Sequence, residues 1–255
     1  MNQAWTVASG KGGVGRSVIA AALANALAGR QMPTVVVDGD IGLRSLDLIL
    51  GVENKVVFDL VDVARRECKL RSALIRSVDR PSLSLLPASQ IAHPESLKAE
   101  DWAYVISKLR KRFAYVLMDA PAGLNNNVKA MLCMTDQVLL TITPDDIAIR
   151  DAERLLAVLD EQRKPRPMLV VNRIRPEWVR KGIMYSPQTV ANVLDVPLLG
   201  FIPEDEQIPL SIHRHETFMD TDCPAKEAML RIVSRFMGEY VPMPKMEKWR
   251  VFARR

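Results

Sequence analysis

Several features of membrane-spanning and secreted proteins are missing from this chain. Its longest apolar run, residues 18–28, is interrupted by Asn25 and is too short to cross a bilayer. The chain does not open with a basic stretch, an apolar core and a cleavage site, so no secretory signal is visible. These absences predict a cytoplasmic protein, although they leave open whether it stays in the cytosol.

Cysteine and histidine are scarce and poorly spaced for metal binding. Cys68, Cys133 and Cys223 form no C-x-x-C pair, and an odd number of cysteines argues against a disulfide framework. We therefore expect buried free thiols. Among the three histidines, His213 and His215 are separated by one residue and are expected in a solvated loop. Neither a zinc site nor an iron–sulfur site is predicted.

The composition is that of an ordinary globular domain with a mild basic bias. The chain has 255 residues, of which 48% are hydrophobic and 25% charged, and it contains no repeat or low-complexity segment. This length lies at the upper end for a single domain. The net charge of +5 suits an acidic partner such as nucleic acid or an anionic membrane, but proves neither.

Apolar strand-like runs alternate with amphipathic helix-like runs, which is typical of a parallel α/β sheet. The expected strands are residues 5–8, 34–38, 82–87, 115–119, 138–143, 168–172 and 198–202. The expected helices are residues 18–28, 97–113, 151–163, 186–194 and 225–238. We predict one doubly wound α/β domain over residues 1–240, with a mostly parallel sheet flanked by helices. A linker and a short amphipathic tail are expected at residues 241–255.

A glycine-rich segment, Ser9-Gly-Lys-Gly-Gly-Val-Gly-Arg-Ser17, lies between the first expected strand and the first expected helix. Strand, glycine-rich turn and helix in this order are typical of a phosphate-binding loop. The glycines let consecutive backbone N–H groups point at an anion, and the helix directs its positive end there. The segment fits G-x-x-x-x-G-K-[ST] except that Arg16 replaces the lysine, and Lys11 adds a cation. The alternative, a chance glycine-rich turn, does not explain the flanking strand and helix.

Carboxylates follow two of the expected strands, at the edge where a parallel sheet binds its ligand. Asp38 and Asp40 end the second strand, where a carboxylate can hold a Mg²⁺-bound water or orient an attacking water. A turn or a helix cap is the alternative use of such an aspartate. Asp119 ends a later strand and fits the metal-side aspartate of nucleotide hydrolases.

Residues 9–15 resemble the deviant phosphate loop of the MinD/ParA ATPases, whose signature lysine corresponds to Lys11. Residues 38–63 resemble the MinD branch of that family, the ATPases of bacterial division-site placement. Further similar segments follow in order at residues 86–90, 119–123, 172–176 and 200–205. The resemblance covers almost the whole chain and implies a P-loop α/β fold, an ATPase activity, and ATP or ADP with Mg²⁺ as cofactors.

The resemblance also assigns roles to individual residues. It implies that Lys11 acts in trans on the phosphates of the partner in an ATP-bound homodimer, that Asp40 positions the attacking water and that Asp119 acts through the outer shell of the Mg²⁺. Ser17 is implied as a direct Mg²⁺ ligand. The implied nucleotide-binding residues are Gly10, Lys11, Gly12, Gly13, Val14, Gly15, Arg16, Ser17, Asn172, Pro203, Glu204 and Asp205.

Two departures from the family pattern bear on hydrolysis. Arg16 stands where the family has the loop lysine, and its planar guanidinium is bulkier than the compact ammonium that fits between the β- and γ-phosphates. Ser45 stands where the MinD branch usually has asparagine. Slow or absent hydrolysis, and with it a nucleotide-bound scaffold, therefore stays open as an alternative.

The last ten residues predict a membrane-binding helix. At helical spacing Met246, Trp249 and Phe252 gather on one side, beside four cations, which suits the headgroup region of an anionic bilayer. MinD-like proteins end in such a helix. A frayed basic tail, or a helix docked on the domain, is the alternative. Because one short helix anchors only marginally, ATP-driven dimerisation would double the anchors and make membrane binding depend steeply on ATP.

The resemblance also implies partners and a location. The partners are a second copy of the chain, a MinC-like division inhibitor, a MinE-like or DivIVA-linked positioning protein, and anionic lipids of the inner membrane. The protein would lie peripherally on the cytoplasmic face of that membrane and position the division septum. Basic clusters at residues 65–71, 108–112 and 163–181 keep a rival open, a ParA-like partition ATPase that binds DNA. An iron–sulfur carrier of the related assembly ATPases is disfavoured, because no C-terminal cysteine pair is present.

Overall fold

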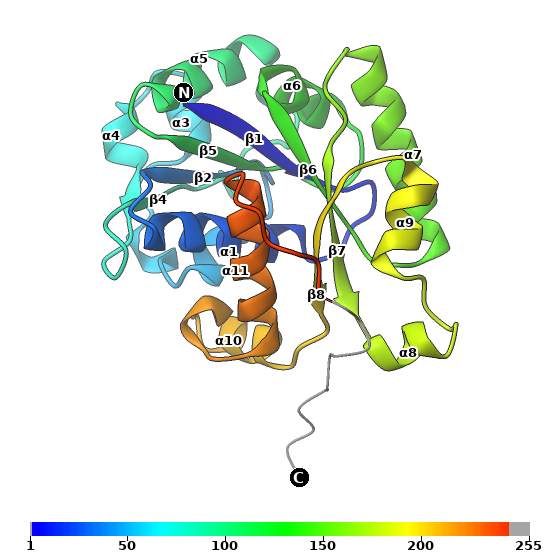
Figure 1. Ribbon diagram of the computed structural model, residues 1–255. Helices are drawn as coiled ribbons and strands as arrows, with labels where there is room; N and C mark the ends of the chain where they lie inside the picture. The colour runs from blue at the N-terminus through cyan, green and yellow to red at the C-terminus, as the bar shows by residue number, and fades with distance from the viewer. Residues whose placement is uncertain (1, 245–255) are drawn as a thin grey trace.

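The computed structural model describes residues 2–244, which fold around one eight-stranded sheet (Figure 1). The strand order is β3-β4-β2-β5-β1-β6-β7-β8, and neighbouring strands are parallel except for the antiparallel pair β3 and β4. The strands are β1 (Gln3–Ala8), β2 (Thr34–Asp38), β3 (Ile75–Arg76), β4 (Leu83–Leu86), β5 (Tyr115–Asp119), β6 (Gln137–Ile142), β7 (Met168–Ile174) and β8 (Leu198–Pro203). The parallel strands bring their carboxyl ends to one edge of the sheet, as predicted.

Eleven α-helices and two short 3₁₀ helices connect these strands within residues 2–244. The helices before β5 are α1 (Arg16–Gly29), α2 (Leu46–Ile49), η1 (Glu53–Lys55), α3 (Leu60–Ala64), α4 (Leu70–Ala73) and α5 (Ala99–Arg110). Those after β5 are α6 (Asn126–Met134), α7 (Asp146–Glu161), α8 (Pro176–Arg180), α9 (Pro187–Leu194), α10 (Gln207–His213), η2 (Phe218–Asp220) and α11 (Pro224–Phe236).

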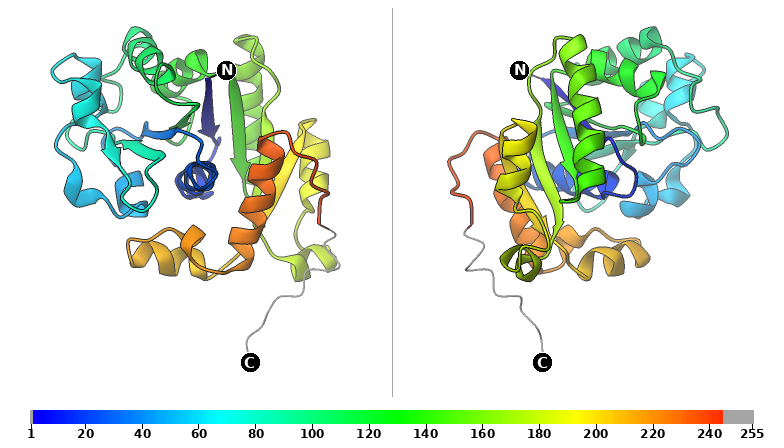
Figure 2. Two further views of the ribbon diagram at one scale, coloured as in Figure 1. Left: turned by 60° about the vertical axis from the view of Figure 1, so that its left-hand side comes forward. Right: turned by 90° about the vertical axis from the view of Figure 1, so that its right-hand side faces the viewer.

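Helices cover both faces of the sheet (Figures 1 and 2). On one face α1 and α11 lie side by side, and on the other α3, α5, α6, α7 and α9 form the second layer. Alternate residues of one strand pack against opposite helix layers, because successive side chains of a strand point to opposite faces of the sheet. In β2, Val35 and Val37 contact one layer and Val36 the other, and all three are fully buried. This explains why the central strands are continuously apolar.

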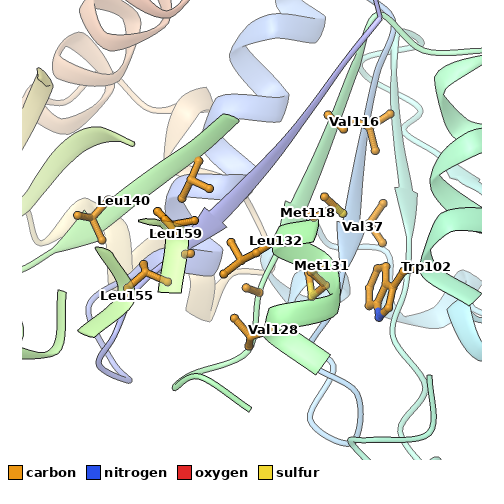
Figure 3. Packing of buried hydrophobic residues seen from close by; sticks show 14 of the residues in the cluster. Val37, Trp102, Val116, Met118, Val128, Met131, Leu132, Leu140, Leu155 and Leu159 are labelled. Carbon is orange, nitrogen blue, oxygen red and sulfur yellow. The ribbon is translucent and has the colours of Figure 1, made fainter. Parts of the chain in front are cut away.

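The larger core ends close to the ligand-binding edge of the sheet. Figure 3 shows Trp102 and Met131 on the side of the sheet where Val37 and Met118 point. The buried Trp102 donates its Nε1–H to Asn127 Oδ1 at 2.8 Å. Asn127 in turn donates from Nδ2 to the carbonyl of Gly39 at 3.3 Å. The packing of α5 and α6 therefore holds the turn that follows β2.

The structure confirms the predicted fold class and every predicted strand, and it corrects several details. Helix α7 begins five residues earlier than predicted, because the Asp145 side chain caps it by accepting the N–H of Ala148. Helix α6 and the short elements α2, α3, α4, β3, α8 and α10 were not predicted. Of the thiols expected to be buried, Cys133 is exposed because it lies on the outer side of α6. The proposed boundary at residue 240 is not tested, since residues 245–255 lie outside the described part.

Candidate functional site

The loop between β1 and α1 has the backbone that a phosphate cradle requires. Gly13 and Gly15 have φ of 76° and 88°, in the left-handed region that favours glycine. A Cβ at Gly10 would lie 2.2 Å from the carbonyl oxygen of Asp151 in α7, so this position also requires glycine. Helix α1 has no side-chain cap and no acid in its first turn. Its first N–H groups thus remain free to bind an anion.

Arg16 does not point out of the loop. Its side chain is 8% exposed, and its Nε lies 3.4 Å from Asp119 Oδ1. A terminal nitrogen of the guanidinium also donates to Ser9 Oγ at 2.6 Å. The cation predicted to bind phosphate is therefore present in the site, where it is held against the buried carboxylate of β5.

Asp119 is fully buried and has free coordination capacity. Neither of its carboxylate oxygens accepts a hydrogen bond from residues 2–244. Burial raises the pKa of Asp119 to about 7, while the charge of Arg16 and the neighbouring Ser17 hydroxyl partly oppose this rise. A buried carboxylate beside the Arg16 guanidinium and the Ser17 hydroxyl at the start of α1 fits a site for Mg²⁺ and its water ligands. The residues present therefore fit the magnesium nucleotide that the sequence predicts.

Asp38 shapes the turn that carries Asp40. It lies opposite Asp119 in the pairing of β2 with β5. Its carboxylate accepts the backbone N–H groups of Asp40, Ser45 and Leu46, each at 3.0 Å. Burial raises the pKa of Asp38 to about 6, against the effect of these hydrogen bonds. The sequence suggested a catalytic use or a turn for the Asp38-Gly-Asp40 segment, and the structure shows that Asp38 forms the turn.

Asp40 is the free carboxylate of this turn. Burial raises its pKa, and the charge of Arg16 opposes that rise. Gly39, between the two aspartates, is confined: its N–H donates to the carbonyl of Asp119 at 2.9 Å, and a Cβ there would lie 2.7 Å from the same oxygen. The turn thus fixes the backbone of Asp40 near Arg16 of the phosphate loop, and its role with an attacking water stays a prediction.

Lys11 lies at the outer side of the loop. Its Nζ is 3.4 Å from Asp145 Oδ1, and both side chains are more than a third exposed. Burial opposes ionisation of Asp145, but hydrogen bonds from the Thr143 hydroxyl and the Ala148 N–H, with the charge of Lys11, lower its pKa below the usual value. Lys11 therefore pairs with a carboxylate of the same chain whose ionised form is favoured.

Asn172 braces the phosphate loop. Its Nδ2 donates to the carbonyl of Val14 at 2.8 Å, and a Cβ at Gly15 would lie 2.4 Å from the same nitrogen. The Oδ1 atom of Asn172 is buried and accepts no hydrogen bond from residues 2–244. This oxygen and the second N–H of Nδ2 remain for the predicted contact with the nucleotide base.

The three residues of the predicted Pro203-Glu204-Asp205 segment have different structural roles. Pro203 ends β8 and is buried. Glu204 is exposed and forms an ion pair with Arg175. Asp205 accepts the N–H of Gln207 at 2.9 Å and of Ala225 at 3.0 Å, so its oxygens hold the starts of α10 and α11. Of the three, Glu204 is the residue that lines the pocket beside the loop.

That pocket measures about 280 Å³ and opens next to Lys11. Its lining residues are Lys11, Gly12, Gly13, Val14, Thr143, Pro144, Asp145, Arg173, Arg175, Trp178, Met184 and Glu204. Arg175 lies over the ring of Trp178, 4.3 Å from its centre. Sequence reasoning missed Arg175 and Trp178 as site residues. Two signals were available: Arg175 lies in the family-like segment 172–176, and both residues follow the strand that ends near Asn172.

The predicted membrane-binding residues Met246, Trp249 and Phe252 lie outside the described part of the chain. Within residues 2–244, no helix combines the length and the apolar character that crossing a bilayer requires. In the same range, no three His, Cys, Asp or Glu side chains form a group that could hold a metal ion by themselves.

The fold and the site define the class of the protein. A phosphate loop between a central strand and its helix, a hydroxyl on the second helical residue and a buried aspartate on the neighbouring strand are the parts of a P-loop nucleotide hydrolase. Residues 5–218 match the CobQ/CobB/MinD/ParA nucleotide-binding domain.

Named relatives place the chain within this class. The septum site-determining protein MinD of Helicobacter pylori is 39% identical over 254 residues, which are 97% of this chain and 95% of that protein. MinD of Bacillus subtilis is 35% identical over 251 residues, 97% of this chain and 94% of that protein. The chain belongs to the MinD/ParA family of P-loop ATPases, as its motifs predicted.

Solved structures agree with this assignment. The chain superimposes on the MinC:MinD cell division protein complex of Aquifex aeolicus with a TM-score of 0.89 and 32% identity, over 95% of this chain and 98% of that one. It matches the septum site-determining protein MinD complexed with Mg-ADP from Pyrococcus horikoshii with a TM-score of 0.83 and 26% identity, over 92% and 96%. A ParA family ATPase from Chlorobium tepidum, at 21% identity and a TM-score of 0.79, shares the fold.

Proposed function

We propose that this chain hydrolyses ATP and that its ATP cycle places the cell-division septum. The observation that carries the proposal is the signature lysine, Lys11, on the phosphate loop that follows β1. The adjacent strand β5 ends in Asp119, and β2, on the other side of β5, ends in Asp38. Relatives named for septum placement match it over nearly their full length, which supports the biological role.

The proposed nucleotide site uses the backbone more than the side chains. The N–H groups of the loop and of the first turn of α1 would hold the phosphates, and Ser17 and Asp119 would hold Mg²⁺ directly and through its water shell. Bound Mg²⁺ neutralises the charge that develops on the transferred phosphoryl group. Asp40, fixed by the turn around Asp38, would orient the attacking water. Arg16 would supply a positive charge below the phosphates.

Lys11 requires a second copy of the chain for its proposed role. Its ammonium sits on Asp145 at the outer side of the loop, where the partner of a face-to-face dimer would lie. The pair is partly exposed, so exchanging Asp145 for the phosphates of the partner costs little. ATP-dependent dimerisation would thereby complete each active site.

We further propose that residues 246–255 bind anionic lipid on the inner membrane face. Their apolar and basic side chains support this role, and a dimer carries two such segments. A division inhibitor of the MinC type is the proposed cargo, because a relative with the same fold forms a MinC:MinD complex. A MinE-like or DivIVA-linked protein would then set where the complex accumulates.

A second candidate function is ATP-dependent DNA binding. The observation in its favour is a group of exposed basic side chains, Arg65, Arg66, Lys108, Lys111 and Arg112, on and beside α3 and α5. Such a surface contacts DNA phosphates without sequence preference, and its binding weakens steeply with salt.

One experiment separates the two candidates. The full chain and a variant ending at residue 244 are sedimented with anionic vesicles and, in parallel, with duplex DNA, each with ATP or ADP. The membrane proposal expects ATP-dependent vesicle binding that is lost with residues 245–255. Vesicle binding that survives the deletion, or ATP-dependent DNA binding that needs no tail, would overturn it.

A further inference from the structure

One side chain holds the segment that follows α11 against the outer strand of the sheet. This segment, residues 239–242, is mostly exposed and forms neither helix nor strand; we call it the strap. Arg235, in the last turn of α11, donates from Nε to the carbonyl of Val241 at 2.7 Å and from Nη2 to that of Pro242 at 2.9 Å. Figure 1 shows the strap turning back from the end of α11 past β8.

The third nitrogen of the same guanidinium ties the strap to the sheet. Arg235 donates from Nη1 to the carbonyl of Leu199 in β8 at 2.8 Å. β8 is the last strand of the sheet and pairs with β7. Gly200 makes this approach possible, since a Cβ there would lie 2.5 Å from Ile232 and 3.1 Å from Arg235 Nη1. One buried-edge arginine therefore joins α11, β8 and the strap through three backbone carbonyls.

A second arginine holds the start of the strap. Arg30 directly follows α1, and its Nη1 lies 2.6 Å from a carboxylate oxygen of Glu239. Its Nη2 donates to Ser234 Oγ in α11, also at 2.6 Å. Hydrogen bonds from charged donors are about twice as strong as neutral ones. The path of the chain from α11 to Pro242 is thus fixed from both ends of the strap.

We propose that Arg235 is a positioning residue for membrane attachment, because it keeps the tether of the lipid-binding segment short. This inference rests on the lipid binding and the ATP-dependent dimerisation proposed above. With the strap held, the three residues 243–245 separate Pro242 from Met246, the first predicted membrane-binding residue. With the strap released from Tyr240 onward, the six residues 240–245 form the tether. The clamp of Arg235 therefore halves its length.

The length of the tether matters because a dimer carries two lipid-binding segments. Once the first is bound, the second binds at an effective concentration that falls as about the −3/2 power of the tether length. Doubling the tether therefore weakens attachment of the dimer about threefold. A monomer has no second binding event, so its attachment does not depend on the strap.

Two variants double the tether by different routes. Arg235→Lys keeps the charge and with it the attraction to anionic lipid, but one ammonium cannot reach three carbonyls spread over β8 and the strap. The control inserts glycine-serine-glycine between Pro244 and Lys245 and leaves Arg235 in place. The full-length proteins are sedimented with vesicles of equal parts phosphatidylglycerol and phosphatidylcholine, with ATP or ADP. Heteronuclear ¹⁵N NOE values of Tyr240 and Val241 show separately whether the strap is held.

With ATP, both variants should bind the vesicles about threefold more weakly than the natural protein, and with ADP all three should bind alike. The NOE values of the strap should match those of α11 in the natural protein and the insertion variant, and fall in Arg235→Lys. An ordered strap in Arg235→Lys, equal binding of the three proteins with ATP, or an equally large loss with ADP would overturn this inference alone. No vesicle binding by the natural protein with ATP would overturn the membrane proposal itself, and this inference with it.

Discussion

The Nε atom of Arg16 lies 3.4 Å from Oδ1 of Asp119, inside the protein and directly beneath the phosphate loop. The pair joins the residue in which the loop departs from its family to the carboxylate that fits the magnesium shell. Each partner stabilises the charge of the other, since both are almost completely buried. A bound nucleotide therefore meets a positive charge already held in position.

The charge of Arg16 should matter more than its shape. We expect Arg16→Gln to lower turnover by about 10²–10³, the usual effect of losing one charge-stabilising group. Arg16→Lys keeps the charge and should stay within about tenfold of the natural protein, which is one step of 1.4 kcal/mol. Phosphate release with ATP and vesicles measures both. A lysine variant more than tenfold faster would show instead that Arg16 restrains hydrolysis, as the scaffold alternative requires.

The raised pKa of Asp119 predicts a specific pH dependence of stability in magnesium- and nucleotide-free protein. Its folded pKa of about 7 lies above the ordinary value of 3.8, so the folded state binds the proton more tightly. This contribution to stability is complete below about pH 4 and is lost as the pH rises through about 7. The asparagine in Asp119→Asn does not titrate, so the stability of the variant lacks this pH-dependent contribution. Relative to the natural protein, the variant should gain about 1–4 kcal/mol of unfolding free energy between pH 5 and pH 8.

Urea unfolding in the presence of a chelator measures this difference at several pH values. Comparing the two proteins cancels the contributions of other carboxylates, including Asp38, whose pKa is also raised by burial. A difference that stays constant from pH 5 to pH 8 would contradict the assignment. The same variant should lose magnesium-dependent nucleotide binding. This loss is measured separately from the change in the pH dependence of stability.

The sequence predicts the parts of this site whose signal is local. The glycine spacing identifies the loop, and the apolar runs of β2 and β5 identify the strands that carry Asp38 and Asp119. It does not predict the direction of Arg16, because that depends on a carboxylate 103 positions away in the chain. The two-residue strand β3 is too short for any alternation to show. Trp178 and Arg175 become site residues only when α8 folds back beside the loop.

Asp38 should affect turnover through the position of Asp40. Its carboxylate holds three backbone N–H groups, and an amide oxygen in Asp38→Asn cannot accept all of them. We expect a loss of about 1–3 kcal/mol in stability together with a lower kcat. Asp40→Asn is the matched control, since it should lose turnover without losing stability. Urea unfolding and phosphate release check the pair, and normal turnover in Asp38→Asn would contradict the link.

Lys11 and Asp145 provide a test of action across the dimer. Their ion pair is partly exposed, so Lys11→Ala should change stability by less than about 1 kcal/mol. Asp145→Asn should keep both stability and turnover, because asparagine also caps helices. Lys11→Ala alone should abolish hydrolysis. Thermal unfolding and phosphate release separate these outcomes.

Mixing two inactive variants then distinguishes trans from cis action. Lys11→Ala lacks the proposed trans lysine, and Asp40→Asn lacks the residue proposed to orient water in its own subunit. In a mixed dimer, the Lys11→Ala subunit keeps its Asp40 and receives Lys11 from the other subunit, so one of the two sites is complete. Since half of randomly assorted dimers are mixed, an equimolar mixture should recover about a quarter of the natural rate. If Lys11 acted within its own subunit, no dimer would contain a complete site and the mixture would stay inactive.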